Sequence, residues 1–301
     1  MNDMSVPSFE SADAVLDHLS DRLADLSPEL RKAASYLLEN PNTISLSSLR
    51  ELGEAADVKP NSFVRMARQV GFDGFEELRA PFKTLVREGG VSFPDRARWL
   101  QSLAEGGQLA GLYRDMAEAA IRNIEETFAN VGDEALLAAA NDIWNCRKVY
   151  TLGVGINASN AQNFTYLAST GLNDFVQIPK PGSTPIDDLA RADQQDTLIA
   201  MTCKPYRAEV VEAVALARDQ GMKIVAIADS PASPIALNAD HILCVSAETP
   251  QFFPSSVSII ALLETLLSFV IAVASPEVVE RVDRFHQRRH TLGIYQRSPD
   301  E

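Results

Sequence analysis

Two short segments of the sequence combine residue types that commonly bind an anion. In the first, "GVGINASNAQ", Gly153 and Gly155 stand between an apolar run and a helical pattern. Glycines at such a turn let backbone amides approach an anion at the N-terminus of the next helix. Position 158 is not a glycine, which argues against a dinucleotide site. The same glycines would also suit a tight turn without any ligand, so both interpretations stay open.

The second segment, "MTCKPYRAEV", spans residues 201–210 and again joins an apolar run to a helical pattern. It offers Thr202, Lys204 and Arg207 as candidate ligand contacts. The guanidinium of Arg207 could hold a carboxylate or a phosphate through two parallel hydrogen bonds, whereas Pro205 removes one backbone donor from the loop. Three outcomes remain: the cations bind an anion, they fill the space that a phosphate would need, or they point into solvent.

A third candidate region precedes the most apolar stretch of the chain. Ser255 and Ser256 could cap the helix expected from Val257 to Ala274, and they could also face a ligand. Glu264 lies at the centre of this stretch and no basic flank sets an orientation, which argues against a membrane span. The pattern instead predicts a helix buried on most sides, at a core or a dimer interface. Glu264 is also the acid that an enzyme could use as a base.

A basic segment near the N-terminus has the residue types that bind DNA. Residues 1–90 hold 10 Lys and Arg against 15 Asp and Glu, yet residues 58–70 contain no acid. Arg65 and Arg68 are three positions apart, so they share one face of a helix. The candidate DNA contacts are Lys59, Asn61, Ser62, Arg65 and Arg68, with Arg79 and Lys83 as flanking phosphate contacts. An ordinary solvated helix would show the same charges.

The elements expected to position these residues change type along the chain. Helical patterns run from Pro28 to Pro41, from Ser48 to Ala56 and from Pro60 to Gly71, and the last two form a helix-turn-helix. "GGVSFPDRARW" reads as a linker because it is rich in helix breakers. From about Arg147, short apolar runs alternate with helical segments, which predicts a parallel sheet covered by helices. In such folds, ligands bind at the carboxyl ends of the strands.

Composition favours a cytoplasmic protein without a metal or a cofactor. The net charge is -14, the hydrophobic content is 46%, and the cysteines number three. Three scattered cysteines suit neither a disulfide framework nor a zinc site. The polar, acidic N-terminus lacks the pattern of a signal peptide.

Several blocks of this sequence resemble one known family. "LSPELRKAASYLLENP", "SLRELGEAADVKPNSFVRMARQVGFDGFEELR", "VYTLGVG" and "SPASPIALNADHILCV" are similar to the RpiR family of bacterial transcription regulators. That family joins an N-terminal helix-turn-helix to a C-terminal sugar isomerase (SIS) domain, and the resemblance covers about residues 15–285. It implies a DNA-binding domain at 1–90, a linker and connecting helix at 91–131, an SIS-like effector-binding and dimerisation domain at 132–285, and a tail at 286–301.

The resemblance also implies a function. It points to a DNA-binding regulator, a homodimer or homotetramer, whose SIS-like domain senses a small anionic metabolite such as a sugar phosphate, a sugar acid or another carboxylate. In SIS domains the first loop carries Gly-x-Gly-x-Ser; here Asn157 takes the Ser place, with Ser159 nearby as a substitute hydrogen-bonding residue. The second loop typically reads Ser-x-Ser-Gly-x-Thr, where this chain has Thr202, Lys204, Pro205 and Arg207. Two alternatives remain: a domain that only oligomerises, and an SIS-fold sugar-phosphate isomerase or related enzyme.

Overall fold

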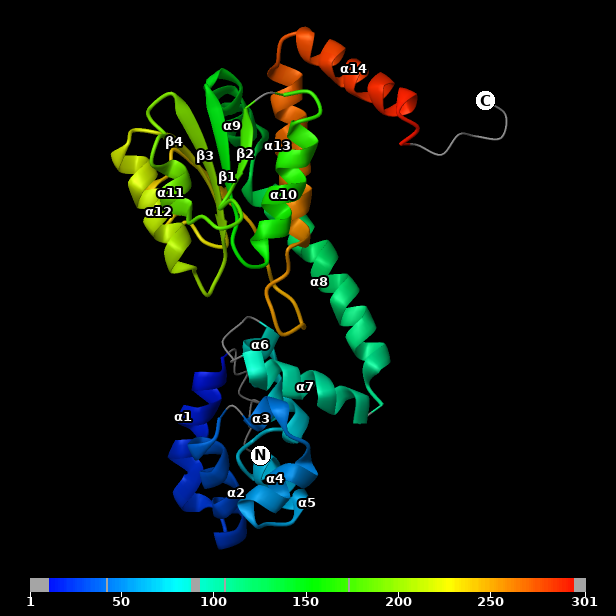
Figure 1. Ribbon diagram of the computed structural model, residues 1–301. Helices are drawn as coiled ribbons and strands as arrows, with labels where there is room; N and C mark the ends of the chain where they lie inside the picture. The colour runs from blue at the N-terminus through cyan, green and yellow to red at the C-terminus, as the bar shows by residue number, and fades with distance from the viewer. Residues whose placement is uncertain (1–10, 42, 88–92, 106, 173, 295–301) are drawn as a thin grey trace, which may run out of the picture. The chain divides into compact units, whose positions relative to one another are not determined.

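The chain folds into two compact units. The structure, a computed structural model, describes residues 11–41, 43–87, 93–105, 107–172 and 174–294 (Figure 1). The first unit comprises residues 1–119 together with 248–255, and the second comprises residues 120–247 and 256–301. The chain therefore crosses between the units three times, once inside a helix and twice around residues 248–255.

The first unit is built from helices only. They are α1 (Ala12–Arg22), the 3-10 turn η1 (Leu23–Asp25), α2 (Pro28–Glu39), α3 (Thr43–Leu46), α4 (Leu49–Ala56), α5 (Pro60–Gln69), α6 (Phe75–Arg87) and α7 (Phe93–Glu105). Leu37, Leu52, Phe63 and Leu78 are fully buried in one core. On each of α2, α4, α5 and α6, the buried apolar residues recur at helical spacing and form one apolar face, which is why these helices pack together.

The turn between α4 and α5 follows from three local features. Ser48 and Glu51 form the expected capping box at the start of α4. A Cβ atom on Gly53 would lie 2.9 Å from the carbonyl oxygen of Val58, so only glycine lets α5 approach α4 this closely. Pro60 occupies the first turn of α5, where its missing amide hydrogen costs nothing. The predicted helix-turn-helix is therefore present.

One expectation for this region is wrong. The segment read as a linker, residues 89–99, is helical from Phe93 onwards, because α7 starts there, and its first four residues lie outside the described residues. Pro94 is the second residue of this helix, and proline near a helix start is favourable rather than disruptive. The connecting helix, α8 (Leu109–Asn130), follows α7 and passes from the first unit into the second.

The second unit contains a five-stranded parallel sheet in the order β2-β1-β3-β4-β5. Its strands are β1 (Lys148–Leu152), β2 (Phe175–Ile178), β3 (Asp196–Thr202), β4 (Lys223–Ala228) and β5 (His241–Cys244). Beyond α8, its helices are α9 (Asp133–Asn145), α10 (Asn157–Ala168), α11 (Pro185–Leu189), α12 (Ala208–Asp219), the 3-10 turn η2 (Ala236–Asn238), α13 (Val257–Val273) and α14 (Glu277–Thr291).

Helices cover both faces of this sheet. Buried side chains of α9, α10 and α13 pack on one face, and those of α11 and α12 pack on the other. Alternate residues of each strand serve the two cores: Ile199 belongs to the first, and Leu198 and Ala200 to the second. The predicted helical domain followed by an α/β domain is confirmed.

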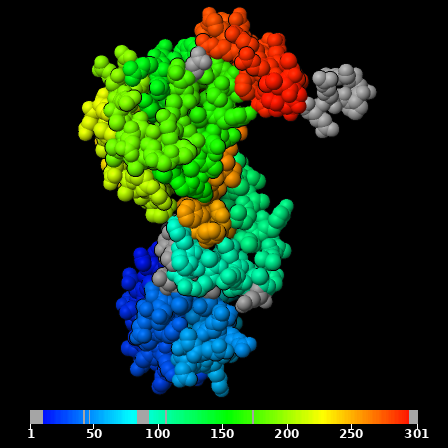
Figure 2. All heavy atoms as spheres, in the orientation of Figure 1, coloured from blue at the N-terminus to red at the C-terminus, as the bar shows by residue number. Residues whose placement is uncertain are grey.

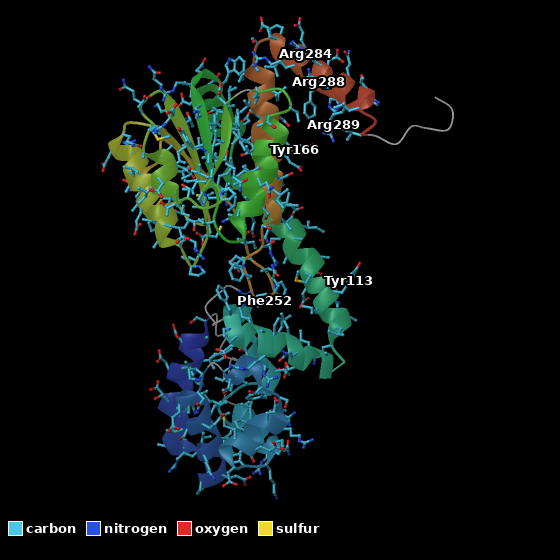
Figure 3. The ribbon with its side chains drawn as sticks, in the orientation of Figure 1. Tyr113, Tyr166, Phe252, Arg284, Arg288 and Arg289 are labelled. Atoms are coloured by element: carbon cyan, nitrogen blue, oxygen red, sulfur yellow. The ribbon has the colours of Figure 1, made fainter. Side chains whose placement is uncertain are left out.

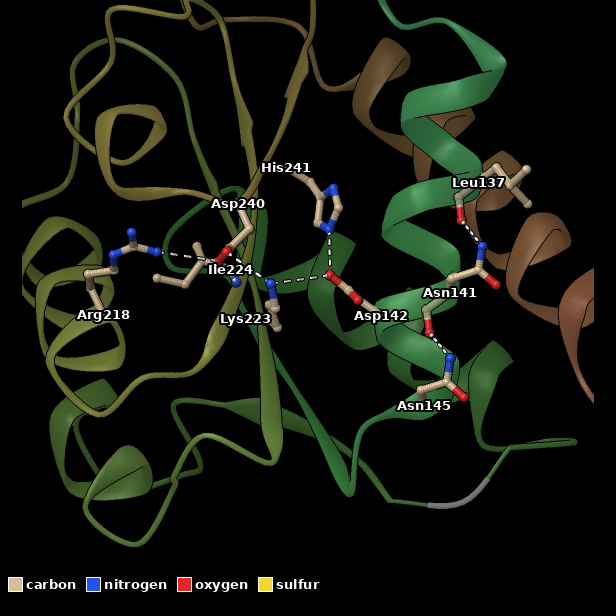
Figure 4. Close-up of polar contacts among 9 residues, drawn as sticks. All are labelled: Leu137, Asn141, Asp142, Asn145, Arg218, Lys223, Ile224, Asp240 and His241. Atoms are coloured by element: carbon tan, nitrogen blue, oxygen red, sulfur yellow. Dashed lines mark hydrogen bonds and ion pairs between the residues drawn. The ribbon is translucent and has the colours of Figure 1, made fainter.

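Ion pairs close the amino-terminal edge of the sheet (Figure 4). His241 at the start of β5 lies 2.8 Å from the carboxylate of Asp142 on α9. Lys223 at the start of β4 lies 3.3 Å from Asp240 and 3.9 Å from Asp142. These contacts fix α9 and β5 at the edge opposite to the candidate ligand loops.

The apolar helix α13 is less covered than its sequence suggested. One face is buried and includes Leu262, Leu266 and Val270, while Glu264 on another face is exposed. Among the described residues, no single helix could cross a membrane; α13 and α14 meet the length and composition only as a pair, and they are bent by 119° at their junction.

The last helix, α14, is attached to the second unit at a few points and is otherwise open to solvent (Figure 2). Val278 is its buried residue, and Gly171 lies so close to Val282 that an added Cβ would stand 2.5 Å from a methyl group. Arg289 donates to the hydroxyl of Tyr166 at 2.6 Å (Figure 3). The helix runs on to Thr291, into the stretch from residue 286 onwards that was expected to be a tail.

Candidate functional site

The outward face of α5 carries the exposed polar residues of the helix-turn-helix. Lys59, Asn61 and Arg65 are exposed, and within the described part of the chain their side chains make no hydrogen bond or ion pair. Arg68 is exposed too, and its Nε donates to the carbonyl oxygen of Asp73 at 3.1 Å. Asn61, Arg65 and Arg68 lie on the side of α5 opposite the buried Phe63, and Lys59 directly precedes the helix, so the packing of α5 presents its cations to solvent.

Ser62 does not share this outward face. It is only 2% exposed, and its hydroxyl donates to the carboxylate of Glu29 at 2.7 Å. This hydrogen bond joins α5 to α2 inside the domain. The serine was a candidate because of its position near the start of the helix, but its direction around the helix axis turns it inward. We therefore assign it a structural role.

Arg79 is also turned into the domain. Its side chain donates to the carbonyl oxygen of Ser47 at 2.7 Å and to Glu76 at 3.1 Å, and its guanidinium lies 4.7 Å from the ring centre of Phe75. Lys83 donates to the same Glu76 carboxylate at 2.7 Å. Burial on its own would raise the pKa of Glu76, but Lys83 and Arg79 bring it below its ordinary value. Neither cation is offered to a phosphate without breaking these contacts.

The first candidate ligand loop connects β1 to α10. A Cβ on Gly153 would lie 2.1 Å from the carbonyl oxygen of Asn157, and Gly155 has a φ of 60°. Asn157 is buried, and its side-chain nitrogen Nδ2 lies 3.4 Å from the carbonyl oxygen of Met201 on β3. Ser159 is exposed and donates to the carbonyl oxygen of Ile156. The glycines thus satisfy backbone packing, and Asn157 ties this loop to the neighbouring strand.

The second loop connects β3 to α12 and meets the first at Arg207. An added Cβ on Gly155 would stand 3.8 Å from Nη1 of Arg207, whose Nη2 donates to Glu209 at 2.5 Å. Thr202 is buried, and its hydroxyl oxygen accepts from the amide of Arg207 at 3.3 Å. Lys204 is exposed. The sequence left three outcomes open for the cations of this loop. In the structure, the side chain of Arg207 is half-exposed and already pairs with the carboxylate of Glu209.

Sequence reasoning missed Asp229, which directly follows β4 at the same edge. Its Oδ2 accepts from the amide of Lys204 at 3.2 Å. Burial, followed by the nearby Asp229 carboxylate, raises the pKa of Tyr206 to about 12. An acid placed just after an apolar strand, as in "KIVAIAD", was the available signal. Glu209 thus pairs with the guanidinium of Arg207, and Asp229 binds the backbone of the loop at Lys204.

The remaining candidates lie elsewhere. Ser255 is 9% exposed and belongs to the first unit, whereas Ser256 belongs to the second. Ser256 precedes α13, but its side chain makes no capping hydrogen bond. Within the described ranges, no group of three or more His, Cys, Asp or Glu residues could hold a metal ion.

Comparison with known proteins agrees with this architecture. Residues 14–86 match the model of the helix-turn-helix domain of the rpiR family, and residues 142–272 match the model of the SIS domain. The chain belongs to the RpiR family. The regulator RpiR of Escherichia coli K12 is 23% identical to it over 282 residues, which cover 90% of this chain and 91% of that protein. An HTH-type transcriptional regulator of Caldanaerobacter subterraneus is 25% identical over 244 residues, covering 79% and 82%.

A solved structure supports the fold of this RpiR-family chain over most of its length. The Vibrio vulnificus NanR protein complexed with ManNAc-6P superimposes with a TM-score of 0.55 at 18% identity, covering 92% of this chain and 98% of NanR. The RpiR-family relatives are named as transcriptional regulators rather than as enzymes. The protein is therefore a transcriptional regulator with a helix-turn-helix domain and an SIS domain.

Proposed function

We propose that this regulator binds a specific operator through the outward face of α5, and that a small anionic metabolite at the carboxyl edge of the SIS sheet changes its affinity for that operator. The observation that carries the proposal is the exposure of Asn61, Arg65 and Arg68 on one helix that has no acid. Phosphate contacts from cations supply affinity, and side chains that reach base edges supply sequence preference. The partner is double-stranded DNA.

The domain limits that we propose follow the family resemblance. Residues 1–90 form the DNA-binding domain and residues 132–285 form the effector-binding and dimerisation domain. A homodimer or homotetramer would present two copies of α5 to a two-fold symmetric operator. We place the protein in the cytoplasm, where its DNA is.

The DNA-binding half is tested with an operator selected from a random DNA pool by the wild-type protein. Fluorescence anisotropy then measures the dissociation constant for Arg65→Ala combined with Arg68→Ala. A base contact contributes about 1–3 kcal/mol, so we expect at least a tenfold loss of affinity. The matched control is Arg191→Ala, which removes one exposed cation from the SIS domain and should leave the affinity unchanged.

Two results would contradict this assignment. The double variant could bind the selected operator as tightly as wild type, which would exclude α5 as the reading helix. Alternatively, Arg191→Ala could weaken binding by a similar factor, which would show that total charge, rather than the α5 face, controls affinity.

The effector-binding half depends on the meeting of the two loops at Arg207. The guanidinium stands beside the backbone of Gly155, near the start of α10, where an anion would also find backbone amides. NanR, which shares the fold, was solved with a sugar phosphate. The neighbouring Glu209 and Asp229 repel an anion, and a ligand that pairs with Arg207 has to displace Glu209 from it. This favours a ligand with neutral hydroxyl groups around one anionic group.

Thermal shift measurements test this half with N-acetylmannosamine 6-phosphate, glucose 6-phosphate, gluconate and inorganic phosphate. We expect one sugar derivative to raise the melting temperature of wild type and of Arg191→Ala, but not of Arg207→Ala. A stabilising ligand that acts equally on Arg207→Ala would remove this arginine from the site. Failure of every sugar derivative would favour an SIS domain that only oligomerises. Turnover of a sugar phosphate that is lost in Glu264→Gln would instead establish the enzyme alternative.

A further inference from the structure

Residues 248–255, between β5 and α13, belong to a different unit from the two elements that they connect. Both β5 and α13 lie in the second unit, yet this segment is part of the first. We call it the β5–α13 segment. Its sequence, "ETPQFFPS", contains two adjacent aromatic residues and two prolines. Such a segment is short and stiff for a loop, because proline fixes its own backbone torsion and restricts the residue before it.

Side chains of α7 bind the middle of the segment. Phe253 stacks on Phe93 with ring centres 4.5 Å apart and an interplanar angle of 26°. The guanidinium of Arg96, which is 3% exposed, donates to the carbonyl oxygen of Thr249. The hydroxyl of Thr249 lies 3.7 Å from the sulfur of Met116 on α8. A buried charged donor and a stacked aromatic pair together fix the segment on this unit.

The residues that flank the segment are bound just as closely within the second unit. The backbone amide of Ser246 donates to Thr127 on α8 at 2.9 Å, and the hydroxyl of Ser246 lies 3.0 Å from Asn123. The hydroxyl of Ser258, on the first turn of α13, donates to the carbonyl oxygen of Ser246 at 2.5 Å. Because both flanks are held, a shift at the end of β5 is not absorbed by slack in the chain.

The end of β5 lies at the same edge of the sheet as the candidate ligand loops. Ala228 pairs with Cys244 in the sheet register, and the amide of Val245 donates to the carbonyl oxygen of Ala228 at 2.9 Å. Asp229, which holds the amide of Lys204, follows Ala228 directly. The β3–α12 loop is thus connected to the start of the β5–α13 segment through the end of β4.

Within the first unit, α7 leads on towards the DNA-binding face. It packs on α3, α3 packs on α6, and α6 packs on α5. Arg79 joins α6 to the end of α3 through the carbonyl oxygen of Ser47. Each of these helices contributes to or contacts one core, so a displacement of α7 acts on a packed body rather than on a flexible chain.

We propose that the β5–α13 segment is the mechanical coupling element by which events at the carboxyl edge of the SIS sheet alter the DNA-binding unit. The proposal rests on the proposed function and specifies its regulation. If the protein has two arrangements of this segment, a ligand that binds the protein with different affinity in each arrangement shifts their populations. Linkage then requires the reverse effect: DNA bound to α5 must alter the ligand loops by the same coupling free energy.

This reciprocity gives a test that needs no knowledge of the effector. Hydrogen exchange is measured on the full-length protein with and without DNA selected from a random pool. In wild type, we expect DNA to change the exchange rates of residues 248–255 and 202–207 by at least twofold. In Phe253→Ala, the affinity for DNA should stay within threefold of wild type, while the change at residues 202–207 disappears. Phe252→Ala is the matched control, since Phe252 is 46% exposed (Figure 3) and contacts the ring of Phe253 edge-on, with 6.1 Å between ring centres, whereas it is Phe253 that stacks on Phe93.

Each other outcome has a defined meaning. If wild type binds DNA and residues 202–207 do not respond, the coupling is refuted and the DNA-binding proposal survives. If Phe253→Ala retains the full response, coupling exists but runs through another connection, such as α8, and the role of the segment is refuted. If no DNA is selected, both proposals fail. Should Phe253→Ala unfold, Arg96→Lys keeps the charge, alters the contact to Thr249 and takes its place with the same expectation.

Discussion

Replacing Arg79 separates a residue that stabilises the helix-turn-helix domain from Arg65, which we propose to contact DNA. Arg79→Met keeps the length of the aliphatic stem but removes the guanidinium. The hydrogen bond to Ser47 from a charged donor contributes about 1.5–3 kcal/mol, and the exposed pair with Glu76 adds at most about 1 kcal/mol. Methionine retains much of the contact with Phe75. Burial of Nε without a hydrogen-bond partner among the described residues offsets part of the gain.

The expected net loss of stability is therefore about 2–3 kcal/mol. Native-state hydrogen exchange of the α5 and α6 amides measures this loss within the full-length chain. Since about 1.4 kcal/mol corresponds to a tenfold change, exchange through domain unfolding should be roughly 30- to 150-fold faster. Arg65→Ala, an exposed substitution, should change the same rates little, because such changes stay within about 0.5 kcal/mol. Unchanged exchange in Arg79→Met, with DNA affinity lost as in Arg65→Ala, would refute the structural role.

The ligand loops give two further predictions. Gly153→Ala should lower the thermal stability of the SIS domain in circular dichroism melting, because its Cβ would stand 2.1 Å from the carbonyl oxygen of Asn157. Gly132→Ala is the matched control: its Cβ would meet nothing within 4 Å, and because it loses only the preference of the α9 N-cap for glycine over alanine, its melting temperature should fall less. Equal melting temperatures of the two variants would mean that the loop at Gly153 adjusts freely. Glu209→Gln should tighten binding of the anion identified by thermal shift up to about fivefold in calorimetry, since it removes an exposed competitor worth about 0.2–1 kcal/mol. Weaker binding would show that Glu209 contacts the ligand instead.

The order of elements was predictable because apolar spacing is set by the backbone period. The helix-turn-helix followed from Pro60, the capping residues and the apolar positions of α4 and α5, which are local features. The parallel sheet followed from apolar runs separated by helical segments. The start of α7 was missed, since a proline and its neighbours were read as breakers although proline suits the first turn of a helix.

Side-chain direction explains the errors at the candidate sites. Ser62 and Arg79 have suitable chemistry and suitable positions along the chain, but each points to a partner on another helix: Glu29 for the first, and the end of α3 for the second. Such partners are 33 and 32 residues distant, which is beyond any spacing rule. Asp229 was missed for the same reason, since its role depends on Lys204 from an adjacent strand-end loop.

The contrast between α5, which has no acidic residue, and the whole chain, whose net charge is -14, affects how the protein finds its site on DNA. Most of its surface repels the DNA backbone, and few cations are available to release counterions from phosphates. Non-specific complexes should therefore be short-lived and only weakly salt-dependent, with little sliding along the duplex. Such a protein would locate its operator mainly by repeated three-dimensional encounters in which α5 leads, so the occupancy of a site would depend steeply on how many copies of the protein the cell contains.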